Sequence, residues 1–354
     1  MNVLLTSVGR SNYLIEGFRS ALNGRGSVFA ADASADAPAL QEADRAFIVP
    51  LINQPDYLDI ILDICRKQKV GLIIPLHELE LPLFAEYREH VVKDGITLVI
   101  SSPYVIDTCS DKWAANNFLK KIGLNVPRTY FTPEKVKIAL EKKELSFPLV
   151  IKPRRGMASI GIEYVEDMEE LELTFRLAKK RVMRTSIAEI SAIDQDLCLL
   201  IQEYMNGQEF GLDVINDLEG RNVTVFVKQK LAMRAGETDR AITVRHEVLE
   251  SLGEKIGNKL GHVGNMDCDV FVDGKDCYVL EMNPRFGGGY PFSHLAGADI
   301  PAAILAWAER KKPVLDWLNI KPGFCSSKTD RLVCKTIESN TFNYIAPSTV
   351  ARPQ

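Results

Sequence analysis

The sequence lacks features that mark several classes of protein. Its seven cysteines, at positions 65, 109, 198, 268, 277, 325 and 334, form no C-x-x-C pair and are odd in number. This usage is typical of reduced thiols rather than of a disulfide framework. No apolar run approaches the roughly 20 residues that cross a membrane, and a polar turn follows only three apolar residues at the N-terminus, which indicates a first strand rather than a leader. We therefore expect a cytoplasmic protein with no membrane partner.

Nucleic-acid binding is not indicated either. The formal net charge is -4, and no basic run is interleaved with aromatic residues. The patterns G-x-x-x-x-G-K-[ST] and G-x-G-x-x-G are both absent. The turn at 7–10 with Asp32 only imitates the second pattern, so we interpret it as one wall of a substrate crevice, with plain structure as the alternative. His77 and Glu78 follow an apolar strand and face the same crevice in one interpretation, or form an ordinary loop in the other.

What is present is an alternation of short apolar strands and amphipathic helices. Strands are predicted at 3–6, 27–31, 46–49, 71–75 and 97–100, with helices at 13–22, 57–68 and 80–89. Strands that are joined through helices form a parallel sheet with right-handed crossovers. The predicted fold class is therefore α/β, with a doubly wound N-terminal domain.

The second half is richer in strands. Predicted elements are a helix at 111–122, a strand at 148–153, a helix at 166–180, a strand at 197–204, several strands over 209–244, a helix at 248–260 and a hairpin over 266–283. After Arg310 the pattern fades, so residues 311–354 are expected to form a short extension.

The strongest chemical signal is the run Glu281-Met282-Asn283-Pro284-Arg285, with Asp269 upstream. Because side chains alternate along a strand, Glu281 and Asn283 point to the same face. A carboxylate and an amide oxygen side by side suit a hard cation such as Mg²⁺, which shares its ligands with nucleotide phosphates. Arg285 adds a planar cation suited to gripping a phosphate or a carboxylate.

Asp269 joins this set only if the hairpin register agrees. A two-residue turn at Asp273-Gly274 would put Asp269 on the face opposite Glu281, whereas a three-residue loop with Gly274 in the left-handed region would put both on one face. We predict the three-residue loop.

Two lysines on separate elements form the second signal. Lys112 opens a helix, and Lys152 ends a buried strand, where an ammonium group needs a partner. They are predicted to be two point charges for nucleotide phosphates, and a strand-end lysine that reaches solvent is the alternative. The loop Arg154–Gly161 that follows contains glycines, which allow backbone N–H groups to turn toward an anion.

In their order along the chain, these segments resemble the ATP-grasp superfamily. The matching segments are Asp111-Lys112, 149–153, Gln202-Glu203-Tyr204, Glu209, Asp269 and 281–285. The similarity is closest to one synthetase half of the carbamoyl phosphate synthase large subunit, extends to biotin carboxylase, and covers about residues 1–310. It implies a two-subdomain ATP-grasp module with antiparallel sheets. Residues 1–108 would be the Rossmann-like domain, 109–195 the small subdomain with a flexible phosphate loop, 196–310 the subdomain with the metal site, and 311–354 an extension.

The resemblance also implies a role for each matching residue. Nucleotide phosphates would be held by Lys112, Lys152, Arg154, Ser159 and Gly161; the adenosine by Gln202, Glu203, Met205 and Glu209; and Mg²⁺, or Mn²⁺ in its place, by Asp269, Glu281 and Asn283. Arg285 and Lys152 would be the catalytic residues, Arg285 by stabilising an acyl phosphate.

The function implied by the resemblance is an ATP-dependent carboxylate–amine ligase that acts on small molecules and releases ADP and phosphate. A homodimer is expected only because dimers are the commonest assembly of soluble proteins. Two departures weigh against carbamoyl phosphate synthesis by this chain alone: only one synthetase half is present, and Asp269 stands where Glu or Gln is commoner. Two alternatives stay open, namely a bicarbonate-activating or carbamoyl phosphate synthase-like enzyme and a catalytically silent nucleotide-binding module.

Overall fold

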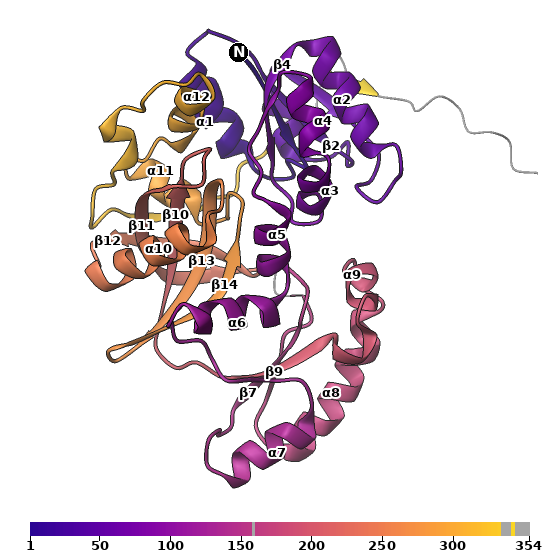
Figure 1. The fold of residues 1–354 in the computed structure, drawn as a ribbon, viewed down its shortest axis with the longest axis vertical. Helices are drawn as coiled ribbons and strands as arrows, with labels where there is room; N and C mark the ends of the chain where they lie inside the picture. Colours follow the sequence, from indigo (N-terminus) through magenta and orange to yellow (C-terminus); the bar gives the residue numbers. More distant parts are fainter. Residues whose placement is uncertain (158–159, 334–340, 344–354) are drawn as a thin grey trace, which may run out of the picture.

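The computed structural model describes residues 1–157, 160–333 and 341–343, which form three sheets along an elongated molecule (Figure 1). Sheet A and its helices occupy one end, sheet C with α7 (Pro133–Glu141) and α8 (Met168–Val182) occupies the other, and sheet B lies between them. Within this part of the chain, no helix combines the length and the apolar character needed to span a membrane.

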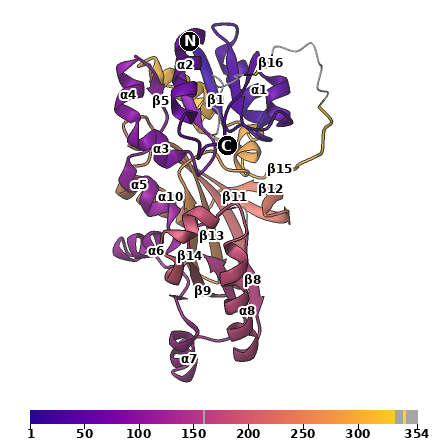
Figure 2. The ribbon, with the colours of Figure 1, turned by 90° about the vertical axis from the view of Figure 1, so that its right-hand side faces the viewer.

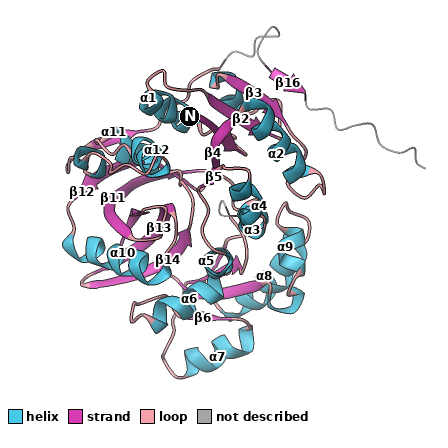
Figure 3. Ribbon diagram, turned by 45° about the horizontal axis from the view of Figure 1, so that its top comes forward, coloured by secondary structure: helices cyan, strands magenta, loops and turns pink. Residues whose placement is uncertain are grey.

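Sheet A is parallel. Its strands, in spatial order, are β16 (Thr341–Asn343), β3 (Arg45–Ile48), β2 (Val28–Asp32), β1 (Asn2–Thr6), β4 (Val70–Pro75) and β5 (Thr97–Leu98). Val3 and Leu5 pack into a core with α1 (Asn12–Leu22) and α12 (Ile300–Ala308), whereas Leu4 packs into a second core with α2 (Tyr57–Gln68). Because both faces of the sheet are covered, the doubly wound prediction is confirmed (Figure 3).

The helices that follow β4 differ in detail from the sequence prediction. The helix predicted at 80–89 is two short helices, α3 (Leu81–Glu86) and α4 (Arg88–Lys93), because Tyr87 departs from helical geometry with ψ at 6°. Sequence reasoning missed α5 (Pro103–Ser110), although Ser102 and Pro103 form an ordinary helix start: the Ser102 hydroxyl oxygen accepts a hydrogen bond from the Val105 amide.

Sheet B is antiparallel and has one apolar and one polar face. Its strands, in spatial order, are β14 (Asp276–Asn283), β13 (Gly264–Asp273), β10 (Gln208–Asn216), β11 (Asn222–Arg234), β12 (Glu237–Val244) and β15 (Cys325–Ser327). Leu212, Val227 and Cys268 point into a core that α6 (Lys112–Lys121) and α10 (Glu247–Leu260) cover. Most of the residues that alternate with them are charged or glycine, namely Gly211, Asp213, Lys228, Asp267 and Asp269, and form the opposite face, whereas Phe226 packs into the core that α1 and α12 share with sheet A.

The hairpin β13–β14 has a shorter loop than predicted, but Asp269 and Glu281 share one face of the sheet, as predicted. Asp273 pairs with Asp276, so the loop contains two residues, Gly274 and Lys275, and not three. Asp269 nevertheless pairs with Glu281, because the register shifts by one residue between Asp269 and Val270, which leaves Leu280 as a β-bulge. Leu280 is thus the extra residue, which the prediction places in the loop.

Sheet C is a smaller antiparallel sheet, with β6 (Thr129–Tyr130), β9 (Leu199–Glu203), β7 (Leu149–Pro153) and β8 (Glu163–Val165) in spatial order. Leu149, Ile151 and Ile201 pack into a core with α7 and α8. Lys152 and Gln202 lie on strand positions that alternate with this core, so they belong to the other face.

Part of the C-terminal extension pairs with two sheets. β15 pairs with β12 and forms one edge of sheet B (Figure 2), and β16 pairs with β3 of sheet A (Figure 3). Between them, Asp330 and Arg331 form ion pairs with Arg234 of β11 and Glu16 of α1, respectively. The segment therefore connects the ends of the two sheets.

Glu80 fixes the strand ends of sheet A. Its side chain is fully buried and accepts hydrogen bonds from the hydroxyls of Ser7 and Tyr57 and from the amides of Leu76 and His77. A buried carboxylate without a cation is stable only when its oxygens are saturated in this way.

Replacing Glu80 by Ala should lower the free energy of unfolding by about 3 kcal/mol, because it leaves buried donors without acceptors. Thermal or urea unfolding measures this loss. Glu86→Ala, an exposed acid on α3, is the matched control and should unfold like the wild type. Equal stability of the two variants would contradict the anchoring role of Glu80.

Candidate active site

The polar face of sheet B gathers acids from neighbouring strands. Asp269 lies opposite Glu281, and Asp267 lies opposite Asn283. On β10, Gly211 pairs with Asp269. The structure therefore places the three predicted metal ligands Asp269, Glu281 and Asn283 on one face, and it adds Asp267, which sequence reasoning missed.

Lysines form ion pairs with these acids. Lys230 Nζ lies 2.6 Å from Asp269 Oδ1 and 2.7 Å from Glu209 Oε1, and Lys112 Nζ lies 3.0 Å from Glu281 Oε1. Burial would lower the pKa of Lys230, but the charges of Asp269 and Glu209 raise it above its ordinary value. Burial alone would raise the pKa of Glu281, but Lys112 and Lys152 hold it below its ordinary value. Lys230 is therefore protonated and Glu281 is ionised at neutral pH.

The donor set suits a hard cation in its chemistry. The three predicted ligands offer only carboxylate and amide oxygens, which Mg²⁺ and Mn²⁺ prefer. Among the described residues, however, no three His, Cys, Asp or Glu side chains are already gathered around a common point. Lys230 and Lys112 form ion pairs with the carboxylates of Asp269 and Glu281, so a metal bound there would have to displace these ammonium groups.

A fully buried ion pair between Lys228 and Asp213 lies on neighbouring strands of the same sheet. Lys228 Nζ is 2.5 Å from Asp213 Oδ2, and both side chains are fully buried; Ser293 donates to the same oxygen at 2.5 Å. A Cβ atom on Gly211 would lie 3.3 Å from Lys228 Cε and 3.5 Å from Lys230 Cε, so this glycine leaves room for both lysine stems. Two lysines two residues apart, directly after the apolar run Val225-Phe226-Val227, were the signal for this pair that sequence reasoning did not use.

Lys152 is a buried cation with a neutral partner. Its ammonium donates to Gln202 Oε1 at 2.6 Å, and Gln202 in turn donates to the Thr129 hydroxyl at 2.9 Å. Burial and the positive charge of Lys112 lower the pKa of Lys152 to about 8, and the charges of Glu281 and Asp269 oppose this shift. Lys152 of sheet C thus lies near Lys112 of α6 and near acids of sheet B, and its ammonium group donates to a neutral amide.

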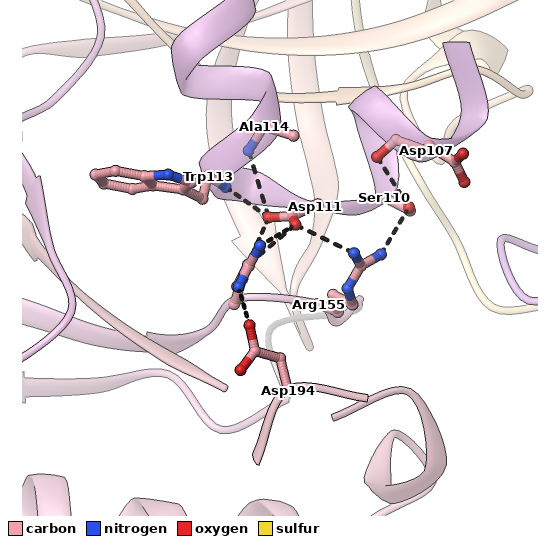
Figure 4. A network of polar contacts seen from close by, with 8 residues as sticks. Asp107, Ser110, Asp111, Trp113, Ala114, Arg155 and Asp194 are labelled. Atoms are coloured by element: carbon pink, nitrogen blue, oxygen red, sulfur yellow. Dashed lines mark hydrogen bonds and ion pairs between the residues drawn. The ribbon is translucent and has the colours of Figure 1, made fainter. Parts of the chain in front are cut away.

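Asp111 ties the loop after β7 to the start of α6 (Figure 4). Its carboxylate accepts from the amides of Trp113 and Ala114 and forms ion pairs with Arg154 at 2.7 Å and with Arg155 at 3.2 Å. Arg154 also pairs with Asp194 at 2.8 Å. The predicted phosphate contact Arg154 is therefore engaged in structural ion pairs, and its role toward a nucleotide stays a prediction.

The remaining predicted nucleotide contacts lie in the loop after β7, at the end of β9 and on β10. Gly161 has a positive φ of 72°, a conformation that favours glycine, whereas Ser159 lies outside the described residues. The carboxylate of Glu203 accepts from the Arg128 amide, and Met205 follows β9 in a loop. Glu209 lies on the face of sheet B beside Lys230. Their roles toward adenosine stay predictions.

Arg285 meets the N-terminal domain. Its guanidinium forms a close ion pair with Glu78, lies 3.7 Å from Asp267 Oδ2 and donates to the backbone oxygen of Phe286. The charges of Glu78 and Asp267 outweigh burial and raise the pKa of Arg285. Glu78 therefore faces the site, as one interpretation of the sequence had it, and connects sheet A to the end of β14.

The glycine run 287–289 passes directly over this face. A Cβ atom on Gly287 would lie 2.1 Å from Asp267 Cγ, and one on Gly289 would lie 2.7 Å from Lys228 Cε. A Cβ atom on Gly288 would lie 3.3 Å from the nearest atom, an oxygen of Glu237. Glycine at 287 and 289 allows the backbone to close over the charged side chains.

Comparison with known families and proteins agrees with this geometry. A family model described as an ATP-grasp domain matches residues 109–289, and one described as the PylC-like N-terminal domain matches residues 3–99. The carbamoyl phosphate synthase large chain of Pseudomonas aeruginosa is 23% identical over 252 residues, which are 68% of this chain and 22% of that protein. The chain thus spans less than a quarter of that relative.

Solved structures show the same fold. Biotin carboxylase from Campylobacter jejuni superposes with a TM-score of 0.70 at 19% identity, over 90% of this chain and 73% of that one. An L-amino acid ligase from Bacillus licheniformis superposes with a TM-score of 0.67 at 18% identity, over 91% of this chain and 78% of that one.

The glycine run gives a graded test. Gly287→Ala should destabilise the protein by about 2 kcal/mol, because overpacking forces the partly buried Asp267 side chain and the backbone apart. Gly288→Ala should change the unfolding free energy by less than about 0.5 kcal/mol, since its neighbours are the ends of flexible side chains. Thermal unfolding of both variants measures the difference, and a Gly288 variant as unstable as the Gly287 variant would contradict this account.

Proposed function

The chain belongs to the ATP-grasp family, and on that premise we propose that it is an ATP- and Mg²⁺-dependent carboxylate–amine ligase. It would join a small-molecule carboxylate to an amine through an acyl phosphate and release ADP and phosphate. The alternatives are weighed below from the same residues.

The observation that carries the proposal is the convergence of Lys152 and Lys112. The two ammonium groups come from different elements and lie near enough for one to lower the pKa of the other. Lys152 is only 6% exposed, and among the described residues the side chain that accepts its hydrogen bond is a neutral amide. Two adjacent cations, of which Lys152 donates to a neutral amide, favour a ligand with several negative charges, such as a nucleotide triphosphate.

The acids beside these lysines account for the metal. Asp269, Glu281 and Asn283 would hold Mg²⁺, which when bound neutralises charge on the phosphates. Release of Lys112 from Glu281, and of Lys230 from Asp269, would free both ammonium groups for anions. Glu209 would then have an oxygen available for the ribose hydroxyls.

Positioning and charge neutralisation suffice for the proposed chemistry. A substrate carboxylate oxygen attacks the γ-phosphorus, and the bond from that phosphorus to the bridging oxygen of ADP breaks. An amine then attacks the carbonyl carbon, and phosphate leaves. Arg285 would stabilise the negative charge of the acyl phosphate, and Lys152 would stabilise that of the transferred phosphoryl group, so no side-chain nucleophile is required.

Bicarbonate activation is the second candidate. It is favoured by the fold likeness to biotin carboxylase and by the presence of an arginine beside the predicted metal ligands. ADP formation that requires bicarbonate and no amine would support it. A silent nucleotide-binding module is disfavoured because a protein that only binds nucleotide does not need the full set of acids and lysines.

Glu281→Gln should reduce ADP release by at least about 100-fold, because an amide is a poorer ligand for Mg²⁺ and leaves Lys112 without its ion pair. Release of ADP is measured with Mg-ATP and a panel of amino acids, small carboxylates, amines and bicarbonate. Glu219→Gln, an exposed acid that pairs with Arg221, is the matched control. An unchanged rate in the Glu281 variant would contradict the metal assignment.

The lowered pKa of Lys152 predicts a pH dependence of ATP binding. As the pH rises through about 8, the free protein loses this positive charge, so the affinity for ATP should fall about tenfold between pH 7 and pH 9.5. In Lys152→Met the affinity should be weak at both pH values. Calorimetric titration with ATP in the two buffers measures both proteins, and a wild-type affinity that does not change with pH would contradict a phosphate role for Lys152.

A further inference from the structure

The ion pair between Arg285 and Glu78 joins the N-terminal domain to the end of β14. The side chains are 17% and 20% exposed, respectively, so both charges are largely removed from water. Glu78 lies in the loop after β4, and its neighbour His77 donates its backbone N–H to the anchored carboxylate of Glu80. Hydrogen bonds to Glu80 therefore hold the loop that carries Glu78 in place.

A ligand that enters between these two groups has to satisfy both of them. A simple anion that binds Arg285 would displace Glu78 and leave a desolvated carboxylate with no cation, which is costly. Asp267, 3.7 Å from Arg285, already adds a second negative charge at this point. A zwitterion avoids the cost, because its carboxylate pairs with Arg285 while its ammonium group pairs with Glu78.

We propose that the acid activated at this site is an amino acid, whose carboxylate is bound by Arg285 and whose ammonium group is read by Glu78. This inference rests on the proposed ligase function and narrows it to one class of substrate. Exchange of one ion pair for two leaves the local charge unchanged, so the site can stay closed to water. Glu78 is then the residue that determines specificity, and bicarbonate or a plain carboxylate lacks the group it recognises.

The chemistry follows from this placement. The carboxylate oxygen attacks the γ-phosphorus and ADP leaves with the electron pair of the broken P–O bond. The ammonium group stays protonated beside Glu78, so it has no lone pair with which to attack. The nucleophile is therefore the amine of a second molecule: a C–N bond forms, the C–O bond to phosphate breaks, and the amine's proton passes to solvent.

Pairs of compounds that differ only in the ammonium group test the proposal in the wild-type protein. ADP release with saturating Mg-ATP is measured for each amino acid and its des-amino analogue, for example alanine with propionate and glutamate with glutarate, in the presence of a second amine such as glycine amide. We expect at least one amino acid to stimulate ADP release ten times more than its analogue. Equal stimulation by the two members of every active pair would overturn the proposal while leaving the ligase function intact.

A variant then locates the recognition at Glu78. In Glu78→Gln, kcat/KM for the active amino acid should fall about 30- to 100-fold, with the KM for ATP within twofold of the wild type. Glu16→Gln, which also removes an acid that pairs with an arginine from a distant segment, should leave both unchanged. A similar loss for the amino acid and for its analogue in the Glu78 variant would show that Glu78 merely positions Arg285.

Ligand-induced thermal shifts provide a readout that does not depend on turnover. With Mg-ADP present, the active amino acid should raise the Tm of the wild type and not that of Glu78→Gln, while the Tm of the unliganded variant shows that it is folded. If no carboxylate, bicarbonate included, stimulates ADP release although ATP binds, the proposed function itself fails and the inference fails with it.

Discussion

Charge compensation on the polar face of sheet B is the constraint on which the rest of the site depends. Five acids lie on or beside this face, namely Glu209, Asp213, Asp267, Asp269 and Glu281. Lysines on β11 and α6 and the arginine after β14 lie within ion-pair distance of each of them. Because buried charges are tolerated only in pairs, the identity of each of these residues restricts that of its partner.

This constraint also determines which parts of the fold meet. Lys112 opens the helix that Asp111 caps, Lys152 ends a strand of sheet C, and Glu78 follows a strand of sheet A. All three approach residues of the β13–β14 hairpin or the lysines beside them. The polar face is therefore the place where groups from the three sheets come together, and local packing within each sheet brings them there.

From the sequence, the positions of the helices and strands could be predicted better than the way in which the strands pair. Alternation of apolar and polar residues located the strands and the hairpin, and it placed Glu281 and Asn283 on one face. It could not reveal the bulge at Leu280, because a bulge depends on how two strands pair and leaves no signal in the composition. For this reason the predicted three-residue loop was wrong, whereas the prediction that Asp269 and Glu281 share one face was right. Lys228, Lys230 and Asp267 were missed because their partners are distant in sequence. The roles of the site residues toward ligands stay predictions.

The ion pairs on this face have the composition that the proposed reaction needs. Under the proposal, Mg²⁺ held by Asp269, Glu281 and Asn283 would replace Lys230 on Asp269 and Lys112 on Glu281, and the two ammonium groups would become available to the phosphates. The positive charge of the metal and the negative charge of the nucleotide would then balance, so that neither the acids nor the lysines are left unpaired. Because each charge compensates the other, we expect the metal and the nucleotide to bind together rather than independently.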